Sequence, residues 1–427
     1  MPVSAKPGDV SYNAPNFSIK IAGGEIPVGV RQLVQRVEYE SAEGMADCLK
    51  VHILDPDTMM PKNSPKAAST SGISGSGGGS GESQRIVDTK LFQPGNEISV
   101  AFGYGTELKH VGASLIRRMR VNYPSNDIPV IEVIAYTKDV VMMDNAPEKS
   151  KKKKGKGGRR FKEKKYSEAV KERAEDYGFE LDIDATPEKP QNFIQKSGLS
   201  DYDFVNGLAN LAGFIFWVDC KDDGKWWLHF KDPEKLSAAD VQDGKKYTFK
   251  YNQGDYSSLL TFEPEILIQG SKTKIKVQCK DMKTGKIIEV EFNEENDKAP
   301  EVKVEPSGAT LKAVDQALGG EHSTGSDIKL FLQDFAFKEY ANHRFETEAD
   351  LIVWGKQWFR RQRENFILAR GSTIGTNHLM SLQTHKITGI GESLSGDYYF
   401  SRVRHVLDNQ NGYICEFDCR KVVPPMP

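Results

Sequence analysis

Alternation of hydrophobic and polar residues is the clearest pattern in the first third of the chain. Val34–Glu40 (VQRVEYE) and Cys48–Leu54 (CLKVHIL) both alternate with a period of two, and the polar segment Ser41–Asp47 separates them. This arrangement predicts a β-hairpin with one buried face. We expect three more strands here, over Ile98–Tyr104, Ser114–Tyr123 and Val130–Val141. Short strands without helical periodicity between them predict a β-barrel or β-sandwich in residues 1–145.

Pro61–Ser83 interrupts this β region with a segment rich in serine and glycine. Such a composition buries too little apolar surface to offset the entropy of ordering the chain, so we predict a flexible insertion between two strands. No Lys-Ser or Lys-Thr pair follows the glycines, and we expect no helix there. A phosphate-binding loop is therefore not predicted.

Helical periodicity replaces strand alternation in residues 166–235. Apolar residues at helical spacing predict a short helix over Ser167–Tyr177. A second helix is expected after Ser200, where Asp203 completes the pattern of a capping box. A hairpin should follow, with strands over Phe214–Asp219 and Trp226–Phe230. We interpret residues 166–235 as an α+β module.

Strand character returns in residues 236–427, which we interpret as a second β domain. Expected strands cover Tyr247–Tyr251, Ser258–Glu263, Ile266–Gln269, Lys274–Lys280, Ile287–Phe292 and parts of the tail from Phe366 to Val423. An insertion over about 294–365 should hold a loop, Glu294–Ser326, and a helix that begins near Thr347. Arg36–Asp55 and Thr261–Lys280 have similar strand, turn and charge patterns, which predict a duplicated β unit.

The net charge of −2 conceals one strongly basic segment. Lys149–Lys165 holds eleven basic residues and one acidic residue, so the rest of the chain has 47 basic and 59 acidic residues, a net charge of −12. We interpret residues 146–165 as a basic linker between domains, because glycines are interspersed among the charges. The competing interpretation is contact with a polyanion. Its candidate residues are Lys151, Lys152, Lys153, Lys154, Lys156, Arg159 and Arg160.

Patterns that support catalysis are missing from the sequence. The eight histidines form no H-E-x-x-H motif, and no G-x-S-x-G elbow occurs. We therefore expect no catalytic residues, no metal site, no cofactor and no enzyme activity. Cys415 and Cys419 should lie on one face of a strand as buried thiols rather than as a metal pair. The aromatic residues Phe214, Phe216, Trp217, Trp226 and Trp227 predict cross-strand core packing, with a stacking platform for sugars or bases as the alternative.

Neither a signal peptide nor a membrane span is predicted. The first twenty residues contain no apolar core of sufficient length, and the longest strongly apolar run, Phe214–Val218, is far shorter than the ~20 residues that cross a bilayer. We expect the protein to be made and assembled in a cytoplasm.

Three stretches, in this order, resemble the late control D or baseplate hub proteins of contractile-tailed phages. They are Phe92–Gly95 leading into Ile98–Tyr104, Ser200–Val218 (SDYDFVNGLANLAGFIFWV), and Gly396–Asp418 (GDYYFSRVRHVLDNQNGYICEFD). The same hub architecture forms the N-terminal part of the VgrG spikes of type VI secretion. The resemblance extends over nearly the whole chain.

This resemblance implies a mainly β protein with an α+β insertion and two tube-like β-barrels. It implies a homotrimer in the virion baseplate that adapts the sixfold tail tube to the threefold spike, with DNA passing through the channel rather than binding specifically. Implied partners are the tail tube protein, a separate spike protein, the tape measure protein and baseplate wedge proteins. A lysozyme insert and a fused spike are not found before Pro427, so we expect a separate spike chain. The alternatives are a tail-associated peptidoglycan hydrolase, or the hub of a tailocin or another contractile injection system.

Overall fold

The computed structural model describes residues 14–56, 85–145, 158–187, 190–221, 224–233, 246–252, 258–266, 274–280, 287–293, 337–340, 351–352, 354–355, 367–392 and 394–421. Within these ranges the protein is mainly β, as expected. The predicted insertion Pro61–Ser83, the loop Glu294–Ser326 and most of the helix near Thr347 lie outside the described residues.

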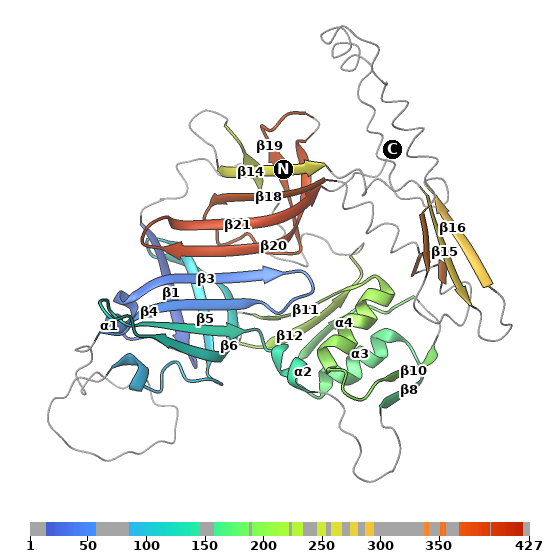
Figure 1. Ribbon diagram of the computed structural model, residues 1–427, viewed down its shortest axis with the longest axis horizontal. Helices are drawn as coiled ribbons and strands as arrows, with labels where there is room; N and C mark the ends of the chain where they lie inside the picture. Colours follow the sequence, from blue (N-terminus) through green and yellow to red (C-terminus); the bar gives the residue numbers. More distant parts are fainter. Residues whose placement is uncertain are drawn as a thin grey trace, which may run out of the picture.

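Thirteen strands form one large sheet (Figure 1). Eleven of them follow each other across the sheet in the order β14 (Leu259–Ile266), β18 (Ile367–Ile374), β21 (Gly412–Lys421), β20 (Gly396–Asp408), β3 (Val34–Ala42), β4 (Cys48–Leu54), β7 (Val130–Tyr136), β6 (Glu107–Asn122), β5 (Glu97–Tyr104), β1 (Pro15–Ile21) and β2 (Gly24–Glu25). The other two are β13 (Thr248–Lys250) and β19 (Gln383–Thr388), which pairs with β20. The expected hairpin over residues 34–54 is confirmed as β3 and β4.

The sheet contains the same four-stranded arrangement twice. We call β3, β4, β6 and β7 the first unit, and β14, β18, β20 and β21 the second unit. When the strands of each unit are counted along the chain, they lie side by side in the sheet in the order first, second, fourth, third. All neighbouring pairs are antiparallel. The predicted duplication is therefore half right: β3 corresponds to β14, but β4 corresponds to β18 and not to the strand at Lys274–Lys280.

The long strands β6 and β20 are divided in the same way. Each first half pairs with an extra strand, β5 or β19, and each has an irregular register before its second half, between Ile116 and Arg118 or between Phe400 and Arg402. The second half of β20 continues to pair, with β3 of the first unit. Among the described residues, the second half of β6 pairs with β7 alone.

Both units bury their apolar faces in one shared core. Phe102 of β5 stacks against Tyr413 of β21 with ring centroids 5.2 Å apart, and the Tyr104 hydroxyl donates a hydrogen bond to the Gly375 carbonyl at 2.9 Å. The described strands form an open sheet and not two closed barrels, so the two-barrel expectation is not confirmed. The physical reason is the β20–β3 pairing, which joins the two units edge to edge.

The α+β module has its own core beside the first unit. It contains α2 (Val140–Asp144), β8 (Arg159–Lys164), α3 (Tyr166–Glu175), β9 (Glu180–Ile183), β10 (Gln191–Gln195), α4 (Asp201–Ala212), β11 (Ile215–Cys220) and β12 (Trp226–Lys231). Both predicted helices and the predicted hairpin are confirmed. The Ser200 hydroxyl accepts a hydrogen bond from the Asp203 amide at 3.0 Å, and Gly213 ends α4 with a φ of 71°.

Two boundaries differ from the expected ones. The strand predicted over Val130–Val141 ends at Tyr136, because a turn stabilised by the Thr137 and Asp139 side chains leads into α2. Residues 159–164, expected in the basic linker, form β8, which pairs with β10.

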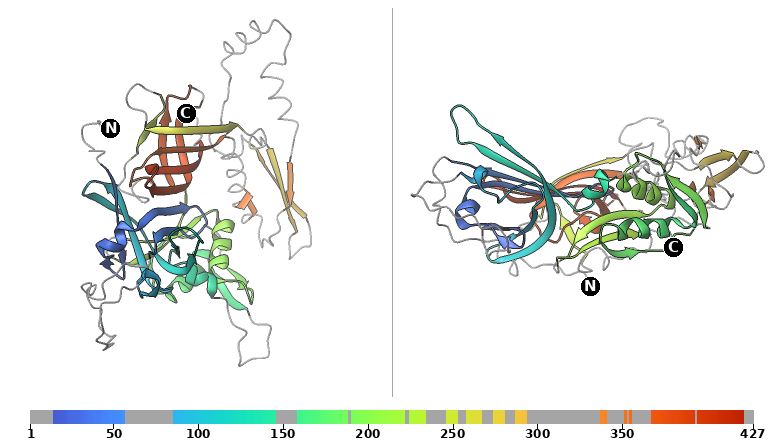
Figure 2. Two further views of the ribbon diagram at one scale, coloured as in Figure 1. Left: turned by 60° about the vertical axis from the view of Figure 1, so that its left-hand side comes forward. Right: turned by 90° about the horizontal axis from the view of Figure 1, so that it is seen from below.

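The remaining elements lie outside these two bodies. Strands β15 (Lys274–Lys280), β16 (Ile287–Asn293) and β17 (Phe337–Tyr340) form a separate small sheet, visible at one side in Figure 2. The short elements α1 (Val28–Gln32) and η1 (Ile86–Asp88) flank the first unit. The two strands expected over residues 258–269 are a single strand, β14, within its described range.

Candidate functional site

One face of the sheet carries charged side chains across the eight strands of both units. Directly opposed residues of neighbouring strands point to the same face. The register connects Glu263 to Arg370, Arg370 to Asp418, and Asp418 to Arg402. Followed in this way to β6, the face holds eight basic residues, Arg36, Lys50, Arg118, Arg120, Arg370, Arg402, Arg404 and Arg420, and eight acidic residues, Glu38, Glu40, Glu132, Glu263, Glu265, Asp408, Glu416 and Asp418. We call it the charged face.

Ion pairs are densest where β20 meets β3, which we call the internal junction. Arg402 Nε lies 2.6 Å from Glu40 Oε1, and Arg404 Nη1 lies 3.8 Å from Glu38 Oε2. Burial alone would raise the pKa of Glu40, but the hydrogen bond and charge of Arg402 outweigh it, so the pKa of this carboxyl is lowered. The same hydrogen bond raises the pKa of the Arg402 guanidinium. The charged groups of the two units are thus matched to each other.

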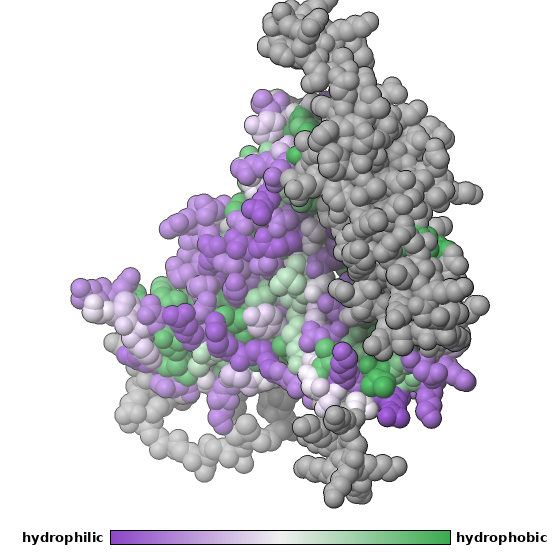
Figure 3. Space-filling model, turned by 45° about the vertical axis from the view of Figure 1, so that its right-hand side comes forward, coloured by the Kyte–Doolittle hydropathy of each residue, from purple (hydrophilic) through white to green (hydrophobic). Residues whose placement is uncertain are grey.

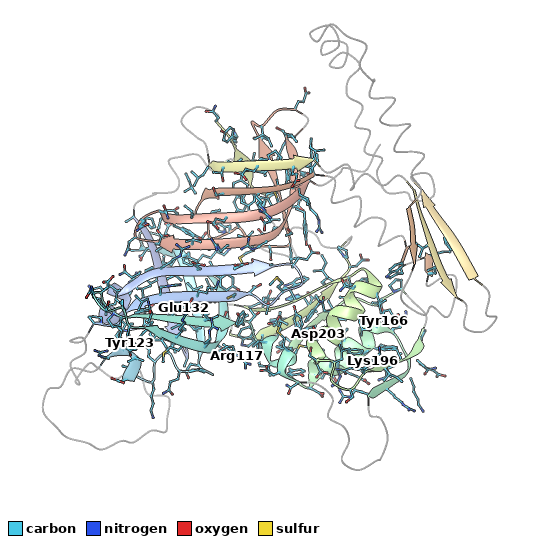
Figure 4. The ribbon with its side chains drawn as sticks, in the orientation of Figure 1. Arg117, Tyr123, Glu132, Tyr166, Lys196 and Asp203 are labelled. Atoms are coloured by element: carbon cyan, nitrogen blue, oxygen red, sulfur yellow. The ribbon has the colours of Figure 1, made fainter. Side chains whose placement is uncertain are left out.

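A third pair crosses the internal junction, where Arg36 Nη1 lies 3.2 Å from Asp408 Oδ2. Beside the junction, Arg404 Nη2 lies 2.6 Å from Glu416 Oε2 on β21. Figure 3 shows hydrophilic residues gathered over much of the β region seen in that view, and Figure 4 places Glu132 on the first unit. A face with balanced, interleaved charge stays hydrated and holds no excess of cations to bind a phosphate backbone.

The two predicted polyanion residues that the structure describes lie away from this face. Arg159 and Arg160 are exposed on β8 of the α+β module, and Arg159 Nη1 lies 3.6 Å from Asp176 Oδ2. The other five, Lys151, Lys152, Lys153, Lys154 and Lys156, lie outside the described residues. Contact between this segment and a polyanion stays a prediction.

The aromatic residues of the β11–β12 hairpin divide between its two faces. Phe214, Phe216 and Trp226 are buried in the module's core, which confirms core packing for these three. Trp217 lies on the opposite face and stacks against the buried His229, with ring centroids 4.5 Å apart and planes 8° apart. His229 Nδ1 lies 2.9 Å from Asp182 Oδ2. His229 therefore covers one face of the Trp217 ring.

Buried carboxyl groups lie where the first unit meets the module. The Tyr39 hydroxyl donates to Asp47 Oδ2 at 2.8 Å, and the Thr137 hydroxyl donates to Asp139 Oδ1 at 2.7 Å. Burial raises the pKa of Asp139 to about 6 and also raises the pKa of Asp47. The Tyr202 hydroxyl of α4 donates to the Gly44 carbonyl at 3.0 Å, so the module is hydrogen-bonded to the β3–β4 turn.

The described residues include no group of three or more His, Cys, Asp or Glu that could hold a metal ion. Cys415 and Cys419 are buried, unpaired thiols on one face of β21, as expected. In the described part of the chain, no helix is long and apolar enough to cross a membrane.

The residues of the charged face could be found in the sequence only in part. Arg-x-Arg occurs at 118–120 and 402–404, and Glu-x-Glu occurs at 38–40 and 263–265. A period of two in a strand puts both charges of each pair on one face, and that signal was available. The partners across the internal junction are hundreds of residues apart in the sequence, so only the fold brings them together.

The family model described as the Alg8 N-terminal domain matches residues 75–409. No curated protein matches. A tail protein from Neisseria meningitidis MC58 has a similar structure, with a TM-score of 0.58 and 10% sequence identity over 96% of this chain and 97% of that chain. The 43 kDa tail protein of prophage MuSo2 from Shewanella oneidensis also gives a TM-score of 0.58 at 10% identity, over 96% of this chain and 98% of that chain.

Sequence identity of 10% establishes a shared fold and nothing more. The match to the family model rests on the sequence and covers most of the chain. This chain belongs to the family described as the Alg8 N-terminal domain, and it has the fold of these two tail proteins.

Proposed function

We propose that this protein is a structural baseplate hub of a contractile phage tail, which adapts the sixfold tail tube to a threefold central spike. Its partners would be a tail tube protein, a separate spike protein, and tape measure and wedge proteins. It would act as a homotrimer in the virion baseplate after assembly in the host cytoplasm. The proposal includes the same hub role in a tailocin or another contractile injection system.

The observation that carries this proposal is the duplicated unit. Each chain places two four-stranded units with one topology side by side on a continuous sheet. Three such chains supply six equivalent wall segments, so a ring of three can match a sixfold tube on one side and a threefold spike on the other. The shared fold with two tail proteins supports the same role.

The charged face suits the wall of a channel. Acidic and basic residues occur on it in equal number among the described strands, and many are already paired within the chain. DNA binds strongly where several cations contact its phosphates, with affinity that falls steeply as salt rises. A balanced wall would let DNA pass without holding it.

The proposed role needs no catalysis. The alternative, a peptidoglycan hydrolase, predicts a cleared band when the purified chain is tested by zymography. We expect no cleared band, and a band that survives purification to homogeneity would favour the hydrolase.

Locating the chain in its particle tests the role directly. Image reconstruction of intact particles should show three copies at the junction of tube and spike. Six copies, or a position on the tail sheath or the tail fibres, would contradict the hub proposal.

A further inference from the structure

The two units correspond residue by residue in register. Arg404 lies opposite Glu416 in the second unit, as Arg120 lies opposite Glu132 in the first. Glu38 lies opposite Lys50 in the first unit, as Glu263 lies opposite Arg370 in the second. The corresponding pairs of strands, in the order first unit to second, are β3 and β14, β4 and β18, β6 and β20, and β7 and β21.

This correspondence identifies what the internal junction joins. There, Arg402 and Arg404 of β20 come directly after the irregular register of that strand. In this part, β20 pairs antiparallel with β3, which holds the Glu-x-Glu motif. Arg404 lies directly opposite Glu40. In β6, the equivalent strand of the first unit, Arg118 and Arg120 also come directly after an irregular register. The equivalent of β3 is β14, whose Glu-x-Glu pair is Glu263 and Glu265.

Those two equivalent edges are unpaired among the described residues. Beyond Ile116, β6 has a strand only on its β7 side, and β14 has one only on its β18 side. Figure 2 shows the β6–β7 hairpin extending past its neighbours, and Figure 1 shows β14 at the far margin of the sheet. Arg118, Arg120, Glu263 and Glu265 are all exposed. Each edge therefore presents free backbone groups beside charges of one sign.

Apolar side chains are exposed beside both edges. Tyr123, just after β6, is 58% exposed, and Ile266 at the end of β14 is 57% exposed. At the internal junction, the corresponding positions, Leu407 on β20 and Ser41 on β3, are 8% and 1% exposed. The edges thus resemble the two sides of the internal junction before they are brought together.

Strand direction allows the same contact between copies. The eight strands from β14 to β6 alternate in direction without exception, so β14 and β6 run in opposite directions. A second copy placed beside the first, with its charged face on the same side, therefore meets β6 with an antiparallel β14. Pro264 has no amide donor, and proline within a sheet is typical of an edge strand.

We propose that β6 of one copy pairs with β14 of a second copy, and that this contact repeats the internal junction. Arg120 lies opposite Glu265 of the neighbouring copy, and Arg118 reaches the same carboxylate diagonally, as Arg402 reaches Glu40. The contact is head to tail, so it joins copies into a closed ring where the rotation between neighbours closes. The number of copies in the ring, three, rests on the proposed function. The residues of the contact are inferred from the strand register alone.

Charge reversal of the full chain tests the contact, with particle mass measured by light scattering or native mass spectrometry. Arg118→Glu with Arg120→Glu should convert the assembled wild type to monomer, and so should Glu263→Arg with Glu265→Arg. The chain with all four substitutions should assemble again. Arg159→Glu with Arg160→Glu is the matched control on β8, and it should leave the mass unchanged. Circular dichroism of each variant checks that it is folded.

Mixing the two double variants tests the contact between copies separately from the number of copies in the ring. Each variant can then pair only with the other, and an odd ring cannot alternate, so the mixture should form dimers or even rings but no closed trimer. A closed even ring of the wild type would keep the contact and refute the threefold hub. A monomeric wild type, double variants that keep the wild-type mass, or a fourfold variant that stays monomeric would overturn the contact.

Discussion

The two β units have one topology and one register, but different neighbours. In the second unit, the Arg-x-Arg segment of β20 is closed against β3, and its charges are paired. In the first unit, the Arg-x-Arg segment of β6 is exposed. At the opposite margin of the sheet, the Glu-x-Glu segment of β14 in the second unit is exposed as well. In a chain with two such units, one of the two equivalent contacts between Arg-x-Arg and Glu-x-Glu strands lies within the chain, and the other would lie between copies. The internal junction is therefore a template for the contact that is still open.

The largest effect is expected when the charges of the Glu-x-Glu motif are reversed on β3, and the same reversal on β14 provides the comparison. Glu38→Arg with Glu40→Arg reverses charges within the internal junction, where Glu38 is 8% exposed. We expect a loss of about 3–5 kcal/mol in the free energy of unfolding, because an arginine at the buried position 38 would face the half-buried Arg404 without an anionic partner. Glu263→Arg with Glu265→Arg should cost the isolated chain only about 1 kcal/mol or less, because both residues are exposed. Denaturant unfolding of both variants as monomers measures the difference, and equal losses would contradict the comparison.

Gly112 offers the next largest effect and concerns the first unit alone. A Cβ atom at Gly112 would lie 2.1 Å from the hydroxyl of the buried Tyr39. Gly112→Ala should therefore destabilise the chain by about 1–3 kcal/mol through overpacking. Gly29→Ala is the control, since nothing lies within 4 Å of a Cβ there. Thermal unfolding of both variants tests this, and an unchanged midpoint for Gly112→Ala would show that the Tyr39 ring can move.

Acidification should affect the region of β19 and β20 and the boundary between the first unit and the α+β module in opposite directions. Burial lowers the pKa of His385 and His405 in the second β region to about 4, so their contribution to stability is present above pH ~6.5 and is lost as the pH falls toward 4. Burial raises the pKa of Asp139 to about 6, so its contribution is lost as the pH rises from ~4 toward 6. Between pH 7 and 5 we expect a loss of about 2 kcal/mol per histidine and a gain of about 1 kcal/mol at Asp139.

Hydrogen exchange measured at pH 7 and pH 5, with intrinsic rates corrected, resolves the two regions. Amides of β19 and β20 should lose protection at pH 5, while those near the β3–β4 turn should gain it. Equal changes in both regions would point to global unfolding instead.

The smallest effect is expected at the edge of the α+β module. Arg159→Ala with Arg160→Ala removes exposed charges that lie far from the internal junction, and surface ion pairs contribute little. The free energy of unfolding should change by less than about 0.5 kcal/mol. A larger change in a denaturant titration would show that β8 depends on these arginines.

Local patterns in the sequence predict local structure well here. The period of two at 34–54 predicts the β3–β4 hairpin, and Ser200 with Asp203 predicts the start of α4. The correspondence of β4 with β18 could not be found in this way, because about a hundred residues separate β14 from β18 while a short turn joins β3 to β4. Which strand edges stay open depends on long-range pairing, which no local pattern contains.

A disulfide placed across the proposed contact is the most direct test. Opposed side chains of an antiparallel pair are close enough for such a bond. A chain carrying Arg120→Cys and Glu265→Cys should form covalently linked rings of copies on oxidation. The wild type, with its five cysteines, should not. The internal pair Arg404→Cys and Glu40→Cys should close within one chain. A chain with Arg120→Cys and Glu265→Cys that assembles but never cross-links between copies would contradict the claim that the open contact repeats the internal junction.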